Sequence, residues 1–504
     1  MTTAASPAVR AVSVTALLIG LGSTLGFVRD LMLGTTFGAD AETDAFLVAW
    51  TIPETAAPLL IEGAMAFVLV PLFSRAVEAG DDLRSLVSST LPHLCLALAA
   101  LSALAAAGAP WLVGVLAPGI PRGDLATDCM RVASVTILTF GLAGYLSAAL
   151  RAREAFAPPA AIYVAYNAGI IACVWALRDQ GAYGAAVGVA AGGVGMVLVQ
   201  APAFVRRFGA PGRPTRGVAL PAAAFLPVAV FTLARQCQVF IERFTGSSLA
   251  EGSISHLNYA QKIAQVPMVL SLVVATVTFP RLARAIAAGD AAQARRRMID
   301  DLVTAAAIVL PATAALVVCA PDVVAVLLEY GAFTEADTAA TARIMQVYSL
   351  GLLGQALVGV GCRAFFCGAR ASWYPVLAMS AGLALTAALA RPAWGVTGIA
   401  AANAAGITLT AAVLVAGLRG RVIALPLRAV AGPVGRLALA AAVAAGAGWA
   451  TRGLLAGLPG PLSLVLSSAA IAAAFCVVAV LTGAVTALPD IAVITRLTGM
   501  RGRP

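Results

Sequence analysis

The chain has 504 residues, of which 61% are hydrophobic and only 11% are charged, and its formal net charge is +10. Soluble domains are typically about a quarter charged, and no long polar stretch of this sequence could form one. The composition therefore excludes a soluble enzyme and predicts an all-α, polytopic membrane protein.

Apolar segments recur along the whole chain, and many reach the roughly twenty residues that a helix needs to cross a bilayer. The first of them follows MTTAASPAVR and has no small-residue cleavage site, so we interpret it as a retained span and not as a signal peptide. Fourteen spans are predicted, at residues 8–37, 43–74, 86–117, 126–150, 158–177, 183–205, 220–247, 252–287, 299–320, 335–367, 373–390, 394–418, 432–452 and 462–488.

The basic residues predict the orientation of these spans. An even number of spans puts both termini on one side. With cytoplasmic termini, 23 of the 33 Lys and Arg residues fall in cytoplasmic segments and six fall outside. This positive-inside bias predicts a multi-pass protein of a bacterial cell membrane with both termini in the cytoplasm. Because the positive charge is spread over short loops, it does not indicate a nucleic-acid partner.

An internal repeat is visible at an offset of 209 residues: PLFSRAVEAGD at 71–81 matches PRLARAIAAGD at 280–290. Two six-span halves in the same orientation imply a pseudo-two-fold axis along the membrane normal, as in transporters whose halves rock around a central site. We predict an N-terminal lobe at 1–210, a C-terminal lobe at 211–420, and a segment at 421–504 with the last two spans and a short cytoplasmic tail.

Prolines interrupt two of the long spans. Pro53 and Pro71 lie in the second predicted span, and Pro267 and Pro280 lie in the eighth. Each proline removes a helix hydrogen bond and favours a kink. Bent helices would suit a gate.

Signals of enzyme chemistry are missing from the sequence. The eight cysteines are scattered without a CxxC pair, there are only two histidines, and no GxxxxGK[ST] phosphate loop occurs. We therefore expect a transporter with no metal site and no bound cofactor.

Charged residues inside the spans are the candidates for binding a substrate. At the bilayer centre such a residue costs roughly 2.5 to 3.5 kcal/mol on translocon scales, so it usually faces a partner or a wet cavity. At about 1.5 Å per residue, Arg29, Glu54 and Lys262 come out at a similar depth, about 13 to 15 Å below the outer rim. The candidate substrate-binding residues are Arg29, Asp30, Asp44, Glu54, Glu62, Arg235, Glu242, Arg243 and Lys262.

Two roles remain open for these charges. Arg29, Arg235 and Lys262 could hold an anionic pyrophosphate group, since Arg offers a bidentate fork and Lys a mobile point charge. Alternatively, ion pairs such as Arg29 with Glu54 or Asp30, and Arg243 with Glu242 or Asp44, could simply hold helices together.

Several motifs resemble the MurJ/MviN family of lipid II flippases. In the first half they are GFVRDLMLGTTFGADAETDAF at 26–46, IP at 52–53, EGA at 62–64 and VP at 70–71. In the second half they are IERF at 241–244, EGSISHLNYAQKIAQVP at 251–267, FPRLARA at 279–285 and LLEYGAFTEADTAATARIMQVYSLGLLGQ at 327–355.

This resemblance implies the multidrug/oligosaccharidyl-lipid/polysaccharide exporter fold, with a V-shaped cavity between two lobes. It also implies export of the undecaprenyl-linked peptidoglycan precursor. By the same resemblance, Arg29, Asp44 and Lys262 take the places of the cavity arginine, the outer-mouth aspartate and the basic residue of the eighth span.

The chain departs from the family pattern at three places. The family usually has an Arg shortly before the LGF motif, an Arg pair before EG, and Asp-Arg after NYA. Here these places hold Ser23, Ala57-Pro58 and Gln261-Lys262. Three cavity cations are therefore missing.

The sequence predicts a flippase that moves lipid II from the cytoplasmic to the outer leaflet by alternating access. A flippase for another polyprenyl-linked glycan, a cation-coupled drug exporter of the same superfamily and a transport-dead envelope scaffold remain alternatives. Coupling to Na⁺, to H⁺ or to the membrane potential is open. The expected partners are the lipid-linked precursor and the bilayer. Association with cell-wall synthesis or division proteins is also open.

Overall fold

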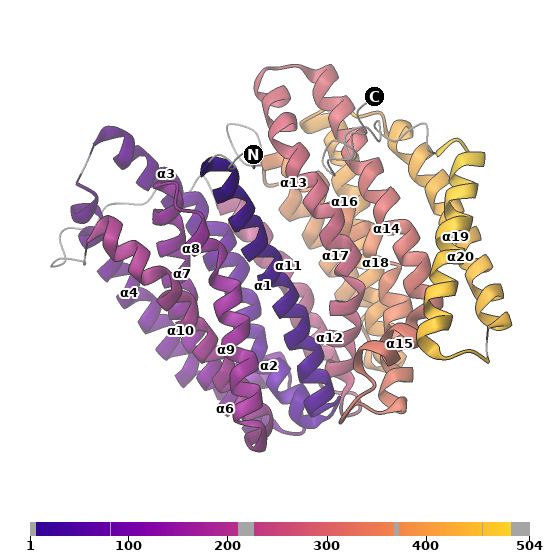
Figure 1. Cartoon of the computed structure of the whole chain (residues 1–504), viewed down its shortest axis with the longest axis horizontal. Helices are drawn as coiled ribbons and strands as arrows, with labels where there is room; N and C mark the ends of the chain where they lie inside the picture. The colour runs from indigo at the N-terminus through magenta and orange to yellow at the C-terminus, as the bar shows by residue number, and fades with distance from the viewer. Residues whose placement is uncertain (1–6, 81, 210–225, 367–371, 456, 485–504) are drawn as a thin grey trace, which may run out of the picture. The chain divides into compact units, whose positions relative to one another are not determined.

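The computed structural model describes residues 7–80, 82–209, 226–366, 372–455 and 457–484, and within these ranges its regular structure is entirely helical. The predicted all-α fold class is therefore confirmed. The chain forms two compact units, one of residues 1–255 with 330–334, and one of residues 256–329 with 335–504. Figure 1 labels most of their helices. The lobes predicted at 1–210, 211–420 and 421–504 stay a prediction.

The first unit contains the helices up to α11 and the first turn of α12. They are α1 (Pro7–Phe37), α2 (Ala41–Ala57), the π-helix η1 (Pro58–Gly63), α3 (Ala64–Ala79), α4 (Leu83–Ala107), α5 (Ala109–Leu116), α6 (Gly123–Ala133), α7 (Val135–Ala152), α8 (Ala157–Ala160), α9 (Ile162–Ala176), the short 3₁₀ turn η2 (Arg178–Gln180), α10 (Gly181–Phe208), α11 (Leu226–Gly246) and the start of α12 (Ser253–Ala264).

Helix α2 lies at the centre of the first unit. Eleven of its 17 residues are buried, as expected for a helix of the core. Phe46 and Trp50 stack at a tilt with ring centroids 5.3 Å apart, and Trp50 lies 6.4 Å from Tyr166 of α9. Phe140 of α7 meets the same tyrosine edge-on at 5.3 Å. This aromatic core fixes α2 against α7 and α9.

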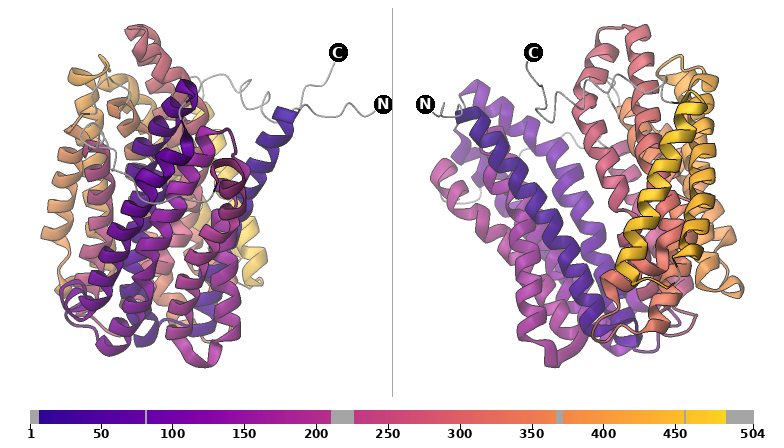
Figure 2. Two further views of the ribbon diagram at one scale, coloured as in Figure 1. Left: turned by 90° about the vertical axis from the view of Figure 1, so that its left-hand side faces the viewer. Right: turned by 45° about the vertical axis from the view of Figure 1, so that its right-hand side comes forward.

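The second unit contains most of α12 and the helices that follow it. They are α13 (Val266–Ala287), α14 (Ala291–Leu328), α15 (Glu335–Ser349), α16 (Leu352–Phe366), α17 (Tyr374–Leu389), the 3₁₀ turn η4 (Pro392–Trp394), α18 (Gly395–Arg421), α19 (Leu427–Leu454) and α20 (Gly460–Leu481). Helices α19 and α20 run side by side (Figure 2). They bury Leu437, Ile471 and Phe475 in one cluster with Val318 of α14.

Ten helices of the described residues are long and apolar enough to cross a membrane, and the bent pair α15 and α16 makes a possible eleventh. Large apolar side chains such as Leu96, Leu454 and Leu481 are 72% or more exposed, as expected for surfaces that face lipid. The chain is therefore a multi-pass membrane protein. Each of the fourteen predicted spans contains helix, but the count of fourteen is not confirmed.

The second predicted span is interrupted by the π-helix η1, between α2 and α3. A π-helix is a rare break in regular helix geometry that is frequent at functional sites. Gly144 of α7 permits this break to pack closely, because a Cβ at Gly144 would collide with the backbone oxygen of Leu60. The eighth predicted span is interrupted at Gln265, where α12 ends and α13 begins with Pro267 in its first turn. Of the four prolines, only Pro267 lies at an interruption, because Pro53, Pro71 and Pro280 lie inside α2, α3 and α13.

The repeated motif has a repeated backbone conformation. Gly80 follows α3 with φ of 72°, and Gly289 follows α13 with φ of 70°. Glycine adopts this left-handed conformation at no steric cost, which ends a helix. Asp82 and Asp290 then cap the next helices by accepting hydrogen bonds from backbone N–H groups. The helix, glycine turn and aspartate cap thus occur in both halves, with Asp82 one position beyond the counterpart of Asp290 in the repeat.

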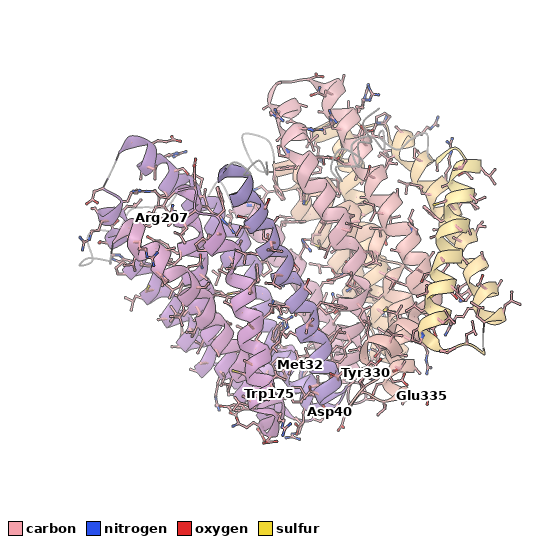
Figure 3. The ribbon with its side chains drawn as sticks, in the orientation of Figure 1. Met32, Asp40, Trp175, Arg207, Tyr330 and Glu335 are labelled. Atoms are coloured by element: carbon pink, nitrogen blue, oxygen red, sulfur yellow. The ribbon has the colours of Figure 1, made fainter. Side chains whose placement is uncertain are left out.

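The first unit has two distinct ends. Asp40, Trp175 and Tyr330 lie near one end, and Arg207 lies toward the other (Figure 3). Trp175 is 72% exposed, and tryptophan is typical of the interface between membrane and water. Residues 330–334 belong to this unit, and Ala332 donates its N–H to the backbone oxygen of Thr35 at 2.9 Å.

Candidate functional site

Arg29 on α1 is buried and held by three different groups. Its Nε and Nη2 donate to Asp30 Oδ1 at 3.0 and 2.6 Å, and its Nη1 donates to Asn167 Oδ1 at 2.8 Å. Its guanidinium also lies 4.7 Å from the ring centroid of Trp50. Of the two partners predicted for Arg29, the structure pairs it with Asp30. The charge of Arg29 is therefore balanced within the first unit.

Asn167, which contacts Arg29, was not predicted as a site residue from the sequence. It sits in the otherwise apolar helix α9, is 4% exposed, and donates its amide to the backbone oxygen of Gly22 at 2.9 Å. It therefore links α9 to α1 and to Arg29 at once. A neutral amide in an apolar span is a recognisable signal, since polar side chains inside membranes are usually partnered.

Asp44 on α2 caps the beginning of α12. Its Oδ1 accepts from the backbone N–H and the hydroxyl of Ser255 at 2.7 and 2.6 Å, and its Oδ2 accepts from the N–H of Gly252 at 2.9 Å. These N–H groups have no partner inside their own helix, and a negative charge at this end is favourable. The carboxylate is 4% exposed, so in this structure it serves packing between segments about 200 residues apart.

Glu54 and Arg243 form a second charged contact of the first unit. Arg243 Nη2 lies 3.8 Å from Glu54 Oε2, and Arg243 Nη1 donates to the backbone oxygen of Ile254 at 3.4 Å. Gln236 of α11 donates to the backbone oxygen of Glu54 at 2.7 Å. Arg243 is 1% exposed and Glu242 is 2% exposed. Arg243 thus lies within ion-pair distance of Glu54, which was not among the two partners expected from sequence, and its charge also acts on Asp44, which was.

The remaining candidates differ in their surroundings. Arg235 of α11 has an exposed side chain, and Lys262 of α12 is half-buried in the second unit, where it interacts with neighbouring groups. The side chain of Glu62 lies outside the part of the structure that is described. The structure thus brings together Arg29 with Asp30, and Glu54 with Arg243.

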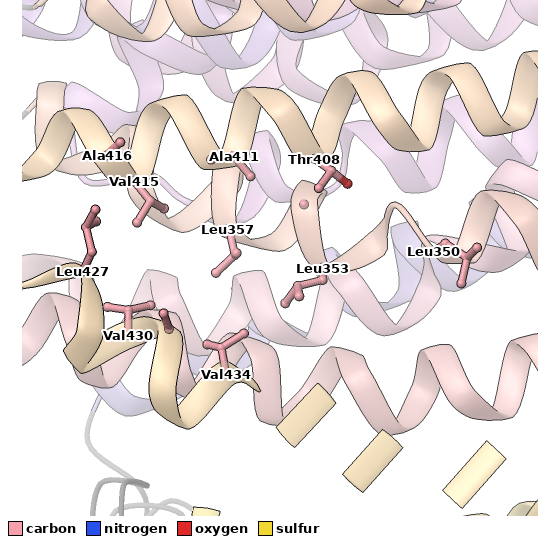
Figure 4. A pocket seen from close by; sticks show the side chains of 13 residues that line it. Leu350, Leu353, Leu357, Thr408, Ala411, Val415, Ala416, Leu427, Val430 and Val434 are labelled. Atoms are coloured by element: carbon pink, nitrogen blue, oxygen red, sulfur yellow. The ribbon is translucent and has the colours of Figure 1, made fainter. Parts of the chain in front are cut away.

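An apolar groove crosses the second unit between α16, α18 and α19. It has a volume of about 370 Å³ and is lined by Leu353, Leu357, Val415, Val430 and Val434, with Thr408 as the one hydroxyl-bearing side chain of its wall (Figure 4). The sequence reasoning did not identify it, since its lining is indistinguishable from ordinary core. A groove of this composition can take a hydrocarbon chain.

Solved structures of membrane transporters share this fold. An inward-facing multidrug resistance MATE-family transporter of the MOP superfamily matches with a TM-score of 0.63 at 14% identity, covering 79% of this chain and 94% of that one. A solved lipid II flippase MurJ in an inward closed conformation matches with a TM-score of 0.76 at 19% identity, covering 92% and 97%.

Sequence comparison gives the family. The family model described as Lipid II flippase MurJ matches residues 33–469, and the chain belongs to this family. The lipid II flippase MurJ of Burkholderia cenocepacia is 28% identical over 80% of this chain and 82% of that protein. The probable lipid II flippase MurJ of Rhizobium meliloti is 30% identical over 69% and 68%. The chain is thus a transporter and not an enzyme.

Proposed function

We propose that this chain is a flippase that moves lipid II from the cytoplasmic to the outer leaflet by alternating access. Membership of the lipid II flippase family over residues 33–469 is the observation that carries this proposal. Two features of the structure support it. Charges of both signs lie within membrane-spanning helices, and an apolar groove of about 370 Å³ is available to a polyprenyl chain.

The anionic pyrophosphate of such a lipid needs cations. Arg29 is engaged with Asp30 and Asn167, so we assign this role chiefly to Arg235 and Lys262. We retain Arg29, Asp30, Asp44, Glu54, Glu62, Glu242 and Arg243 as residues that shape the site and its gating. Coupling to Na⁺, H⁺ or the membrane potential is also part of the proposal, and Asp44 and Glu54 are the carboxylates that such coupling would involve.

Lys262 gives the test of the substrate. Lys262→Glu reverses the field where an anionic group should pass, so transport per folded molecule should be abolished, while Lys262→Ala should lower it less. Lys262→Arg keeps the charge and should keep activity. The assay is lipid II translocation in vesicles, or rescue of a flippase-depleted bacterium, normalised to folded protein. Normal transport by Lys262→Glu would show that this residue does not handle the substrate.

Orientation is proposed with cytoplasmic termini in the bacterial cell membrane. Asp40 and Arg207 lie toward opposite ends of the first unit (Figure 3), as this topology requires. In a cysteine-free background, single cysteines at Arg207 and Arg297 should react with an impermeant thiol reagent only from the cytoplasm, and one at Asp40 only from outside. Labelling of positions 40 and 297 from the same side would contradict the proposed topology.

A flippase for another polyprenyl-linked glycan is the second candidate. The observation that favours it is the absence of three family cations, where this chain has Ser23, Ala57 and Pro58. A weaker hold on the pyrophosphate would then be compensated by contacts to a different head group. Rescue of a flippase-depleted cell separates the two candidates, since only a lipid II flippase restores growth.

A further inference from the structure

A cluster of neutral amides surrounds one tyrosine hydroxyl in the second unit. The Tyr348 hydroxyl accepts from Gln261 Nε2 at 2.8 Å and from Gln355 Nε2 at 2.9 Å, and Gln265 Nε2 lies 3.4 Å away. Tyr348 is 2% exposed, whereas the three glutamines are half-buried. The tyrosine is therefore the buried centre of the cluster, and the amides form its accessible side.

This cluster joins two interrupted helices. Gln261 lies on α12 and Gln265 at the break before α13, while Tyr348 lies near the end of α15 and Gln355 near the start of α16. Helices α15 and α16 are bent by 46° at their own break. One hydroxyl thus ties α12 and the break that follows it to both sides of the break between α15 and α16. Discontinuous membrane helices are where transporters commonly build substrate sites, near the bilayer midplane.

The depth of the cluster agrees with such a site. At about 1.5 Å per residue, Gln261 lies about 12 Å from the beginning of α12, and Tyr348 about 20 Å from the beginning of α15. Both values fall in the middle of a hydrocarbon core about 30 Å thick. Amides at this depth are costly unless they are bonded or face a polar space.

The cluster has hydrogen-bonding capacity to spare. A hydroxyl offers one donor and two acceptor lone pairs, and each glutamine amide offers two N–H donors and a carbonyl. All three contacts come from amide N–H groups, so the hydroxyl oxygen accepts at most two of them at a time, the two shorter ones being those of Gln261 and Gln355. Each half-buried amide also has a second N–H and a carbonyl that the contact with Tyr348 does not use, and this alternation of donors and acceptors matches hydroxyl and amide groups better than an anion.

We propose that Gln261, Gln265 and Gln355, oriented by Tyr348, form a neutral subsite that binds the uncharged hydroxyl and amide groups of the lipid-linked head. This inference rests on the proposed flippase function and divides the substrate between two kinds of contact. Lys262, three residues before Gln265, serves the anionic neck. The glutamines serve the sugar- and peptide-bearing part.

The test compares two lipids that share the neck but differ in the head: lipid II, and undecaprenyl pyrophosphate without any glycan. Gln355→Leu and Gln261→Leu each remove hydrogen-bonding groups at nearly constant size. Each should weaken lipid II binding about 3- to 10-fold, the loss expected for one or two hydrogen bonds. Binding of undecaprenyl pyrophosphate should not change. Tyr348→Phe, which removes the orienting hydroxyl, should show the same selectivity.

Gln346→Leu is the matched control. Gln346 lies on the same helix α15 and is also half-buried, but its amide donates to the backbone oxygen of Val317 at 2.9 Å. A purely structural effect of losing a glutamine would appear in this variant too and would not distinguish the lipids. Equal weakening of both lipids, or no weakening in Gln355→Leu and Gln261→Leu beyond the control, overturns the subsite.

The two proposals fail in different ways. A wild-type protein that neither binds nor translocates lipid II overturns the flippase function and the subsite with it. The subsite alone is overturned if the wild-type protein translocates lipid II and the glutamine variants still prefer lipid II over undecaprenyl pyrophosphate as strongly as the wild type does. Binding is measured on folded protein in lipid nanodiscs, so that misfolded fractions do not enter the comparison.

Discussion

Arg29 and Arg235 are both arginines in or beside apolar helices of the first unit, but their surroundings are opposite. Arg29 is 9% exposed and is held by Asp30, Asn167 and the face of Trp50. Arg235 has an exposed guanidinium. A cation whose donors are already taken stabilises its helices, whereas an exposed cation can meet a ligand. Charge in a span therefore does not by itself define a binding residue.

The largest expected effect comes from Arg29→Ala. It leaves the carboxylate of Asp30 and the amide of Asn167 without their shared partner, and removing one member of a buried ion pair costs about 3 kcal/mol or more. The free energy of unfolding in detergent should fall by this amount. The double variant Arg29→Ala/Asp30→Ala should recover part of it, because no lone charge remains. Unchanged stability of Arg29→Ala would show that Arg29 does not stabilise the packing of its helices.

Asp44→Ala should have the next largest effect. It removes the acceptor of three hydrogen bonds at the beginning of α12, and loss of a helix cap costs about 1 to 2 kcal/mol. Asp44→Asn keeps the oxygen that accepts from Ser255 but loses the charge and the acceptor of the Gly252 N–H, so its cost should be smaller than that of Asp44→Ala, about 0.5 to 1 kcal/mol. Hydrogen exchange at Gly252 and Ser255 should accelerate in the Ala variant. Equal damage by both substitutions would mean that the charge, and not the cap, is what matters.

Much of this fold can be predicted from the sequence, because a membrane helix is recognised by a local run of apolar residues. The break at Gln265 is likewise local, since Pro267 causes it. The partners of charged groups are not local. Asp44 meets Ser255 across 211 positions and Arg29 meets Asn167 across 138, and no periodicity encodes such distances.

The glutamine cluster shows a different limit. Neutral amides carry no charge signal, so Gln261 and Gln355 were not singled out as candidates, although they meet at one hydroxyl. Glu54 was expected to pair with Arg29 but lies 3.8 Å from Arg243. Which carboxylate reaches which arginine is decided by how α2, α9 and α11 rotate about their axes. That rotation depends on packing between helices, which a single sequence does not display.

Arg235→Ala should have the smallest effect on stability and completes the comparison with Arg29. An exposed side chain away from caps and buried pairs usually changes the free energy of unfolding by no more than about 0.5 kcal/mol. If the exposed guanidinium meets the anionic neck of the substrate, lipid II translocation per folded molecule should fall about 5- to 10-fold, the loss of a charge-assisted contact. Arg235→Lys should retain most of the activity, since the positive charge persists without the fork. The measurements are thermal unfolding in detergent and translocation in vesicles, made on the same preparations as Arg29→Ala. A stability loss in Arg235→Ala with normal transport per folded molecule would reverse the two roles, and Arg29 would then be the arginine to test against substrate.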